Sequence, residues 1–232
     1  MKKWIALLLA ALLVMSLAAC SPSTPAENQN TATDSAADAP ATDSAAPEST
    51  EPEVDFEAGT VENNTYTSSL LGITATLDEN WYFLNREEID QIYGITSEAM
   101  DDEEIAKKLE DGSTYADMYA TDQSTGATVN VNIQNVGLTA LLVSEEAILE
   151  AAEGEVIAAL ESMGLSDVKY ELGTMQFAGK EHACVYITGQ INGTTLYETQ
   201  VCVKNGNYVG SITASTVGGD GTGEILGAFK AK

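Results

Sequence analysis

The sequence is poor in histidine and in basic residues. Its 232 residues include one histidine, His182, and 10 Lys or Arg residues against 36 Asp or Glu residues. So few cations cannot form the basic face that nucleic acid requires, and we expect no nucleic-acid partner. No Gly-x-Ser-x-Gly turn and no His-Glu-x-x-His pair occurs, which argues against nucleophilic hydrolases and zinc hydrolases. An enzyme that uses only carboxylates stays open as a lesser alternative.

Proline and glycine are each missing from one part of the chain. All five prolines lie between Pro22 and Pro52, and all 19 glycines lie at or after Gly59. Residues 20–60 also contain nine acidic residues and no basic ones. A segment of this composition cannot bury enough apolar surface to offset the entropy lost when it becomes ordered. We therefore predict a disordered acidic tether over residues 20–60 and one folded domain over residues 61–232.

Residues 1–19 have the features of a cleaved signal peptide. Lys2 and Lys3 precede an uncharged apolar run that is shorter than the roughly 20 residues of a membrane-spanning helix. Small residues follow this run, as a signal peptidase site requires. We therefore interpret the run as an export signal rather than as a permanent span.

The end of this region, Leu17-Ala18-Ala19-Cys20, resembles the lipobox of bacterial lipoproteins. The resemblance implies that the Cys20 thiol carries a diacylglyceryl group and that Cys20 becomes the N-terminus after cleavage. Acyl chains such as palmitate would then anchor the chain to the extracytoplasmic face of the cell membrane. The alternative is an ordinary secretory signal in which Cys20 is incidental.

Hydrophobic spacing predicts an α+β domain with an antiparallel sheet of about six strands and helices packed on it. Two short strands are expected within 65–77, and Trp81 follows them as a core anchor. The further expected strands are 115–121, 127–136, 180–188, 194–203 and 207–215, and the expected helices are 86–93, 101–109, 144–164 and 224–229. Ser144 is the expected N-cap of the long helix, which should pack through the apolar stripe Leu149, Ala152, Val156, Leu160 and Met163. Asn205-Gly206 predicts a hairpin turn in which Lys204 pairs with Asn207.

Two cysteines lie in the domain, Cys184 and Cys202. A three-residue loop at 191–193 places Val185 on the core face of the sheet, so that His182, Cys184 and Cys202 share the opposite face. These three side chains could form a soft-metal or thiol-redox site. The alternative is two small apolar thiols and a histidine covered by a helix. Whether the thiols form a disulfide stays open.

Four consecutive carboxylates, Asp101, Asp102, Glu103 and Glu104, could offer oxygen ligands to calcium or manganese. The alternative is that they stabilise the first turn of a helix through its dipole. No other cofactor is expected. The glycine-rich segment 218–223 connects a strand to a helix but lacks the Lys-Ser/Thr of a phosphate-binding loop, so it is interpreted as a connector.

Over about residues 64–230 the chain resembles the PsbP-like family, named after an extrinsic subunit of photosystem II and shared by many bacterial lipoproteins. The residues that carry the resemblance are 71–77 running into Trp81, the long helix after Ser144, the strand at 208–212 and the closing segment 226–230. The family often has a proline shortly before the tryptophan, where this chain has Asp78-Glu79-Asn80. The resemblance implies an α/β/α sandwich and a non-catalytic module that docks on larger assemblies, sometimes with a divalent cation.

These features together predict a lipoprotein anchored in the lipid bilayer through Cys20, outside the cytoplasm. Its domain is expected to be a non-enzymatic binding or accessory module for another envelope protein. A module that binds divalent cations is the alternative.

Overall fold

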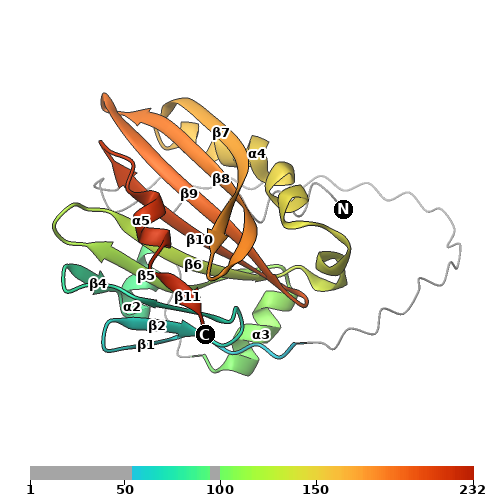
Figure 1. Ribbon diagram of the computed structural model, residues 1–232. Coiled ribbons are helices and arrows are strands. Elements are labelled where there is room, and N and C mark those ends of the chain that lie inside the picture. Colours follow the sequence, from blue (N-terminus) through green and yellow to red (C-terminus); the bar gives the residue numbers. More distant parts are fainter. Residues whose placement is uncertain (1–53, 95–99) are drawn as a thin grey trace, which may run out of the picture.

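The computed structural model describes residues 54–94 and 100–232. The predicted signal peptide, the lipobox residues Leu17, Ala18, Ala19 and Cys20, and the tether up to residue 53 lie outside the described residues. The described part contains two antiparallel sheets and four α-helices (Figure 1). The predicted α+β class is therefore confirmed.

The large sheet has seven strands rather than the predicted six, in the order β4-β5-β6-β10-β9-β8-β7. Its strands are β4 (Trp81–Phe83), β5 (Thr114–Asp122), β6 (Thr128–Asn135), β7 (Ser166–Phe177), β8 (Lys180–Ile191), β9 (Thr194–Asn205) and β10 (Tyr208–Val217). The sequence analysis missed β7, an edge strand whose side chains are mostly exposed, so that it lacks a long apolar run.

A second, small sheet was not predicted as a separate layer. Its order is β1-β2-β3-β11, formed by β1 (Thr60–Glu62), β2 (Thr65–Ser68), β3 (Ile73–Thr76) and β11 (Phe229–Ala231). The predicted helix at 224–229 is shorter, α5 (Thr222–Leu226), because Phe229 pairs with Ala75 in this sheet. The small sheet therefore joins the first and last segments of the domain.

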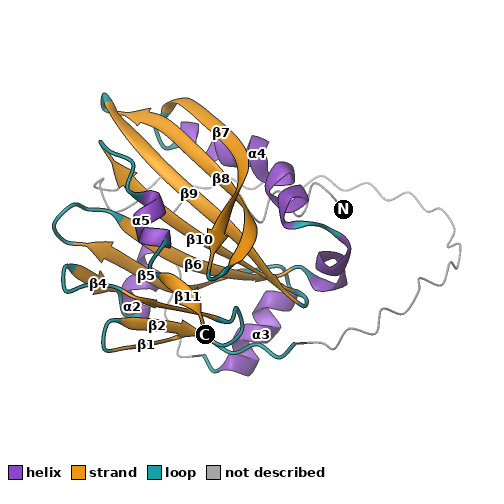
Figure 2. Ribbon diagram, viewed as in Figure 1, coloured by secondary structure: helices purple, strands orange, loops and turns teal. Residues whose placement is uncertain are grey.

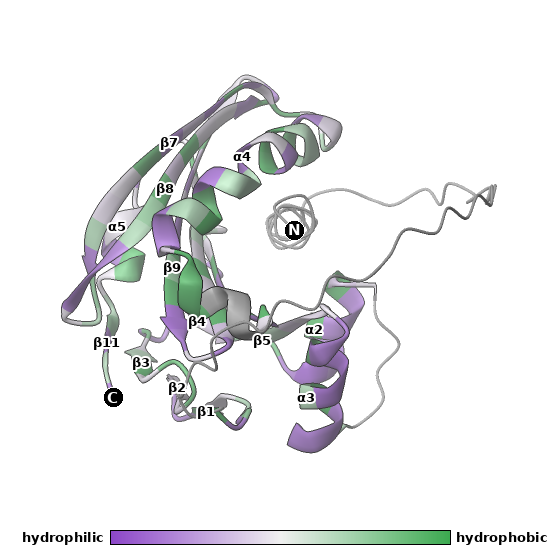
Figure 3. Ribbon diagram, turned by 90° about the vertical axis from the view of Figure 1, so that its right-hand side faces the viewer, coloured by the Kyte–Doolittle hydropathy of each residue, from purple (hydrophilic) through white to green (hydrophobic). Residues whose placement is uncertain are grey.

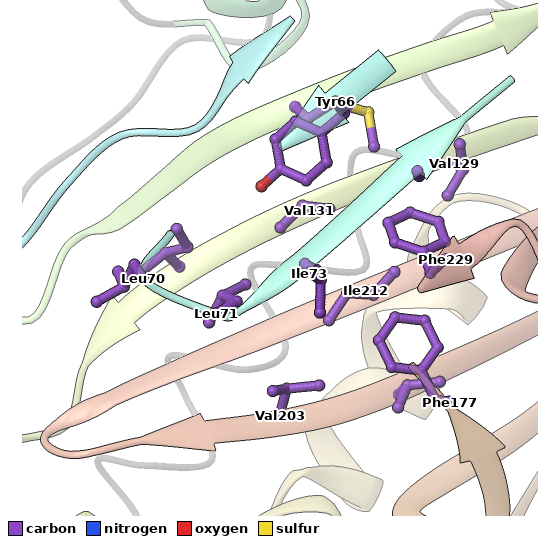
Figure 4. Packing of buried hydrophobic residues seen from close by; sticks show 14 of the residues in the cluster. Tyr66, Leu70, Leu71, Ile73, Val129, Val131, Phe177, Val203, Ile212 and Phe229 are labelled. Atoms are coloured by element: carbon purple, nitrogen blue, oxygen red, sulfur yellow. The ribbon is translucent and has the colours of Figure 1, made fainter. Parts of the chain in front are cut away.

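The main core lies between the small sheet and one face of the large sheet. Figure 4 shows Tyr66, Ile73 and Phe229 packed toward Val131 and Ile212 of β6 and β10. Leu71 lies so close to Gly210 that a Cβ atom at position 210 would approach its side chain to 2.5 Å. This close approach explains why the strand at 208–212 carries a glycine at its centre.

The helices are α2 (Arg86–Ile92), α3 (Asp102–Glu110) and α4 (Glu145–Ser162), with a 3-10 segment η2 (Gly137–Leu142) before α4 (Figure 2). The predicted N-cap is confirmed, since Ser144 Oγ accepts from the Ala147 amide at 3.1 Å. Helix α4 packs on β7, β8 and β9, on the side of the large sheet away from the small one (Figure 3). No helix of the described residues has the length and apolarity needed to cross a bilayer.

The packed part of the chain begins earlier than the predicted domain boundary at residue 61. Phe56, which the prediction places in the tether, is buried, with its ring centroid 5.6 Å from that of Tyr115 and 5.9 Å from that of Tyr208. Val54 contacts the hairpin at Gly206. One aromatic ring thus provides enough buried apolar area to hold this short acidic segment on the domain, and the division into tether and domain stays a prediction.

Candidate functional site

A cleft of about 570 Å³ lies at one end of the molecule, where the end of β3 approaches the end of β10. Trp81 at the start of β4 lines it, and so do Gly219 and Gly221 of the segment after β10. The predicted connector role of 218–223 therefore includes forming a wall of this cleft. Trp81 is half-buried and packs against the main core, as predicted, and it also borders the open space.

Three carboxylates line the cleft: Asp78, Asp122 and Glu224, with no Lys or Arg among the lining residues. Asp122 Oδ1 accepts hydrogen bonds from Ser124 Oγ at 2.6 Å and from the Ser124 amide at 2.7 Å. The bond from the Ser124 hydroxyl contributes most to lowering the pKa of Asp122. Ionised carboxylates beside an indole ring form an environment that favours a cationic group.

A second pocket of about 570 Å³ lies between α3 and β5 and is lined largely by apolar groups, including Met100, Leu109 and Tyr115. Two cations, Arg86 and Lys108, and the carboxylate Asp90 also line it, so its charges have both signs. Arg86 is already engaged, since Nε lies 2.9 Å from Asp90 Oδ1 and Nη1 donates to the Ala116 carbonyl at 2.7 Å. The first cleft is therefore the better candidate for recognition of a charged partner.

The four carboxylates proposed as cation ligands lie at the start of α3. Asp101 is the N-cap, accepting from the Glu104 amide at 3.0 Å, and the Glu104 carboxylate accepts from the Asp101 amide at 3.2 Å. Asp102 accepts from the Ala58 amide at 3.3 Å, and Glu103 is exposed in the first turn. Within 54–94 and 100–232, no group of three or more His, Cys, Asp or Glu side chains is placed to hold a metal ion. The capping role is thus visible, and cation binding stays a prediction.

The predicted cluster of His182, Cys184 and Cys202 does not form. Ile191 pairs with Thr194, so the loop between β8 and β9 has two residues and not three. Cys184 pairs with Val201 and belongs to the main core, whereas Cys202 lies in the core under α4. A shift of one residue reverses the face of every side chain on a strand, so the two thiols point to opposite sides of the sheet.

Both thiols are free and buried. Burial raises the pKa of Cys184 and of Cys202 above the ordinary value for a thiol. Groups held in the thiol form are poor nucleophiles and poor ligands for a soft metal. The structure therefore places the two cysteines as small core side chains, of which only Cys202 lies under a helix as the alternative expected.

His182 instead contacts Glu145, the first residue of α4, a partner that the sequence analysis missed. Its Nδ1 lies 2.9 Å from Glu145 Oε1, and the amides of Ala183 and Lys204 donate to the same carboxylate at 3.1 and 3.3 Å. Burial alone would raise the pKa of Glu145, but these hydrogen bonds outweigh it and keep the pKa below its ordinary value. Glu145 thus connects α4 to β8 and β9 beyond Cys184 and Val201, the last residues that pair these two strands.

No protein-family model and no curated protein matches the sequence. Among solved structures, the chain is similar to cyanobacterial PsbP (CyanoP) from Synechocystis sp. PCC 6803, with 9% identity and a TM-score of 0.45, over 81% of this chain and 100% of that one. It is also similar to LpqN of Mycobacterium tuberculosis, which is involved in cell envelope biogenesis. That match has 11% identity and a TM-score of 0.34, over 67% of this chain and 76% of the other.

Proposed function

We propose that the chain is a lipoprotein anchored at the extracytoplasmic face of the membrane, and that its domain is a non-enzymatic binding module for another envelope protein. The leader and the lipobox ending at Cys20 support the location. The observation that carries the binding role is the cleft, because it combines Trp81, three carboxylates and no lining cation.

The chemistry of the cleft favours a basic segment of the partner. A Lys or Arg side chain placed over the face of Trp81 gains a cation–π interaction, and Asp78 and Glu224 add electrostatic attraction. The formal charge of the whole chain is −26, which would accelerate the approach of a basic partner at low ionic strength. The same charge disfavours contact of the domain with anionic lipid.

Affinity purification from native membranes tests this proposal. The double variant Asp78→Asn with Glu224→Gln removes two exposed charges from the cleft, and we expect the co-purified partner to fall about tenfold or more. The double variant Glu146→Gln with Glu150→Gln removes two exposed charges from α4, so it is the matched control and should retain the partner. Equal recovery of the partner with the cleft variant and the control would refute the role of the cleft.

Two further measurements separate the remaining alternatives. Cys20→Ser should move the protein from the membrane fraction to the soluble fraction, because the lipid would be lost.

Titration with calcium and manganese tests the cation-binding alternative, since an ion that binds the folded state raises Tm. An unchanged Tm removes that alternative, and a rise of several degrees that Asp101→Asn abolishes would replace partner binding with cation binding.

A further inference from the structure

Polar side chains form a continuous buried patch on the face of the large sheet that α4 also covers. We define the polar patch as two cross-strand rows: Asn130, Thr213 and Gln200 form one row, and Thr128, Ser215 and Glu198 form the other. Each of the six side chains is at most 5% exposed. In the order of the sheet, β6 and β10 lie between β5, which contacts α2, and β9, which contacts α4.

The hydrogen bonds within the patch leave four buried atoms without a partner in the described part of the chain. Ser215 Oγ donates to Glu198 Oε2 at 2.9 Å, and Asn132 Nδ2 donates to Asn130 Oδ1 at 2.7 Å. The unpartnered atoms are Thr128 Oγ1, Asn130 Nδ2, Glu198 Oε1 and Thr213 Oγ1. All four lie within the two rows, on three adjacent strands.

Such a concentration of unpartnered atoms requires a physical explanation. A buried polar atom without a hydrogen bond destabilises the fold, and folded proteins contain few of them. Apolar residues would satisfy the packing of this face at lower cost, as they do on the opposite face of the same strands at Val129 and Val131. An interaction with a molecule outside the chain would explain why this face is polar.

The identity of the four atoms restricts the chemistry of that molecule. The Asn130 amide nitrogen only donates, an ionised Glu198 only accepts, and the two threonine hydroxyls do either. Above about pH 7, the value to which burial raises the pKa of Glu198, an anion would be repelled by this carboxylate, because the patch contains no Lys or Arg. A cationic amine would leave Asn130 Nδ2 without an acceptor. A neutral molecule that carries several hydroxyl groups can satisfy all four atoms, because each hydroxyl can both donate and accept.

We propose that the polar patch binds a small, neutral, hydroxyl-rich molecule of the polyol or saccharide class. Aromatic rings adjoin the patch, since Tyr119 pairs with Asn130 across β5 and β6, and Tyr93 Oη donates to Asn132 Oδ1 at 2.8 Å. Such rings can pack against the C–H faces of a polyol while the hydroxyls bond to the strands. This site lies on the opposite face of the sheet from the main core and does not depend on the cleft or on a protein partner.

Nuclear magnetic resonance titration of the full chain tests the proposal. The protein is held in a zwitterionic detergent, because glycoside detergents would compete for the site. Maltose, N-acetylglucosamine and glycerol are the neutral probes, and acetate and ethylamine are the charged controls. We expect at least one neutral probe, and neither control, to shift the side-chain amide resonances of Asn130 saturably. Absence of a saturable shift with all three neutral probes would overturn the proposal.

Thr213→Val and Thr199→Val form a matched pair of variants. Thr213→Val keeps the shape of the side chain but removes one unpartnered hydroxyl, and we expect about tenfold weaker binding of the probe. Thr199 lies on β9, on the opposite face, where its hydroxyl bonds to that of Thr222 at 2.7 Å, so Thr199→Val should leave binding unchanged.

The same pair separates a binding role from a purely structural one. Thr213→Val should maintain or raise Tm, because it removes a hydroxyl that no described group satisfies. A lower Tm with unchanged probe affinity would show that the hydroxyl serves the fold alone and would refute the proposal. A crystal structure grown with maltose that shows only ordered water on the four atoms would also refute it.

Discussion

The two faces of β6 and β10 differ in how completely their side chains are satisfied. On one face, Val131 and Ile212 pack under the small sheet in a continuous apolar core. On the other face, Asn130 and Thr213 are equally buried but retain polar atoms without a described partner. The same two strands thus carry one face that stabilises the fold and one face whose unpartnered polar atoms destabilise it. The proposed binding of a ligand explains the second face. Where a buried face is polar and incompletely bonded, function is the first explanation to test.

Of the variants discussed, Phe229→Ala should cause the largest loss of stability, because it removes a large side chain from the apolar core. Phe229 is fully buried, and its ring centroid lies 5.2 Å from that of Phe177 on the edge strand β7. Removal of the ring should lower the free energy of unfolding by about 3–5 kcal/mol, measured by urea denaturation. Lys230→Ala, at the exposed neighbouring position, should change it by less than about 0.5 kcal/mol. Similar losses for the two variants would show that the buried ring of Phe229 does not stabilise the main core.

Glu198→Gln tests the polar face through the pH dependence of stability. Burial raises the pKa of Glu198 from its ordinary value of 4.5 to about 7 in the folded protein, although the Ser215 hydrogen bond lowers it. Between these two pH values the folded state binds more protons than the unfolded state, so this group makes stability fall as pH rises. The loss is complete above pH 7 and amounts to about 3 kcal/mol.

We therefore expect Glu198→Gln to be more stable than the wild type at about pH 8, with a smaller difference or none at about pH 4.5. Urea denaturation at the two pH values measures both differences, and subtraction of the wild type cancels most titrations elsewhere. A difference that is the same at both pH values would show that Glu198 ionises normally, as an exposed carboxyl does.

Glu145→Ala tests the connection between α4 and the polar face of the large sheet. Loss of the carboxylate leaves the amides of Ala183 and Lys204 and the His182 ring without this acceptor, which should cost about 2 kcal/mol. Because the folded pKa of Glu145 is lowered, its contribution is present above its ordinary value of 4.5 and is lost as pH falls through the folded pKa. Glu146 is exposed, and Glu146→Ala is the control variant. Thermal unfolding at neutral pH and at acid pH should show a loss of Tm for Glu145→Ala that is smaller at acid pH, and little change for Glu146→Ala at either pH.

Oxidation of the two core thiols should have the smallest effect. Cys184 and Cys202 belong to cores on opposite faces, so a mild oxidant should not join them. Unfolding and alkylation after oxidant treatment should give a mass with two modified thiols. A Cys184–Cys202 disulfide in that measurement would contradict the register of β8 and β9 and with it the assignment of the two faces.

The sequence predicted the elements well because their boundaries carry local signals. The N-cap Ser144 and the apolar stripe of α4, and the turn between β5 and β6, are encoded within a few residues. The hairpin at Asn205-Gly206 was predicted two residues out of register, since Asn205 pairs with Tyr208. A shift of two keeps every side chain on its face, so the core faces of β9 and β10 were still predicted correctly.

The hairpin between β8 and β9 shows why the candidate site was harder to predict. Asn192 and Gly193 both have positive φ, as a two-residue turn requires, and Asn-Gly is the strongest local signal for it. The prediction added Ile191 to the loop, and that single residue moved the cysteines to the wrong faces. The polar patch was also visible as alternation, in Thr128-Val129-Asn130-Val131-Asn132. Its burial depends on packing between distant segments, which no local pattern reports.

The position of Phe56 determines at which end of the domain the N-terminal segment attaches. Val54 and Phe56 pack at the Gly206–Tyr208 end of β10, whereas Val217 at the other end of this strand borders the cleft. Ten residues of β10 separate the two ends, a distance of about 30 Å. In the proposed lipoprotein, the segment from Cys20 would therefore join the domain at the first end, and the acidic cleft would lie at the end remote from this attachment.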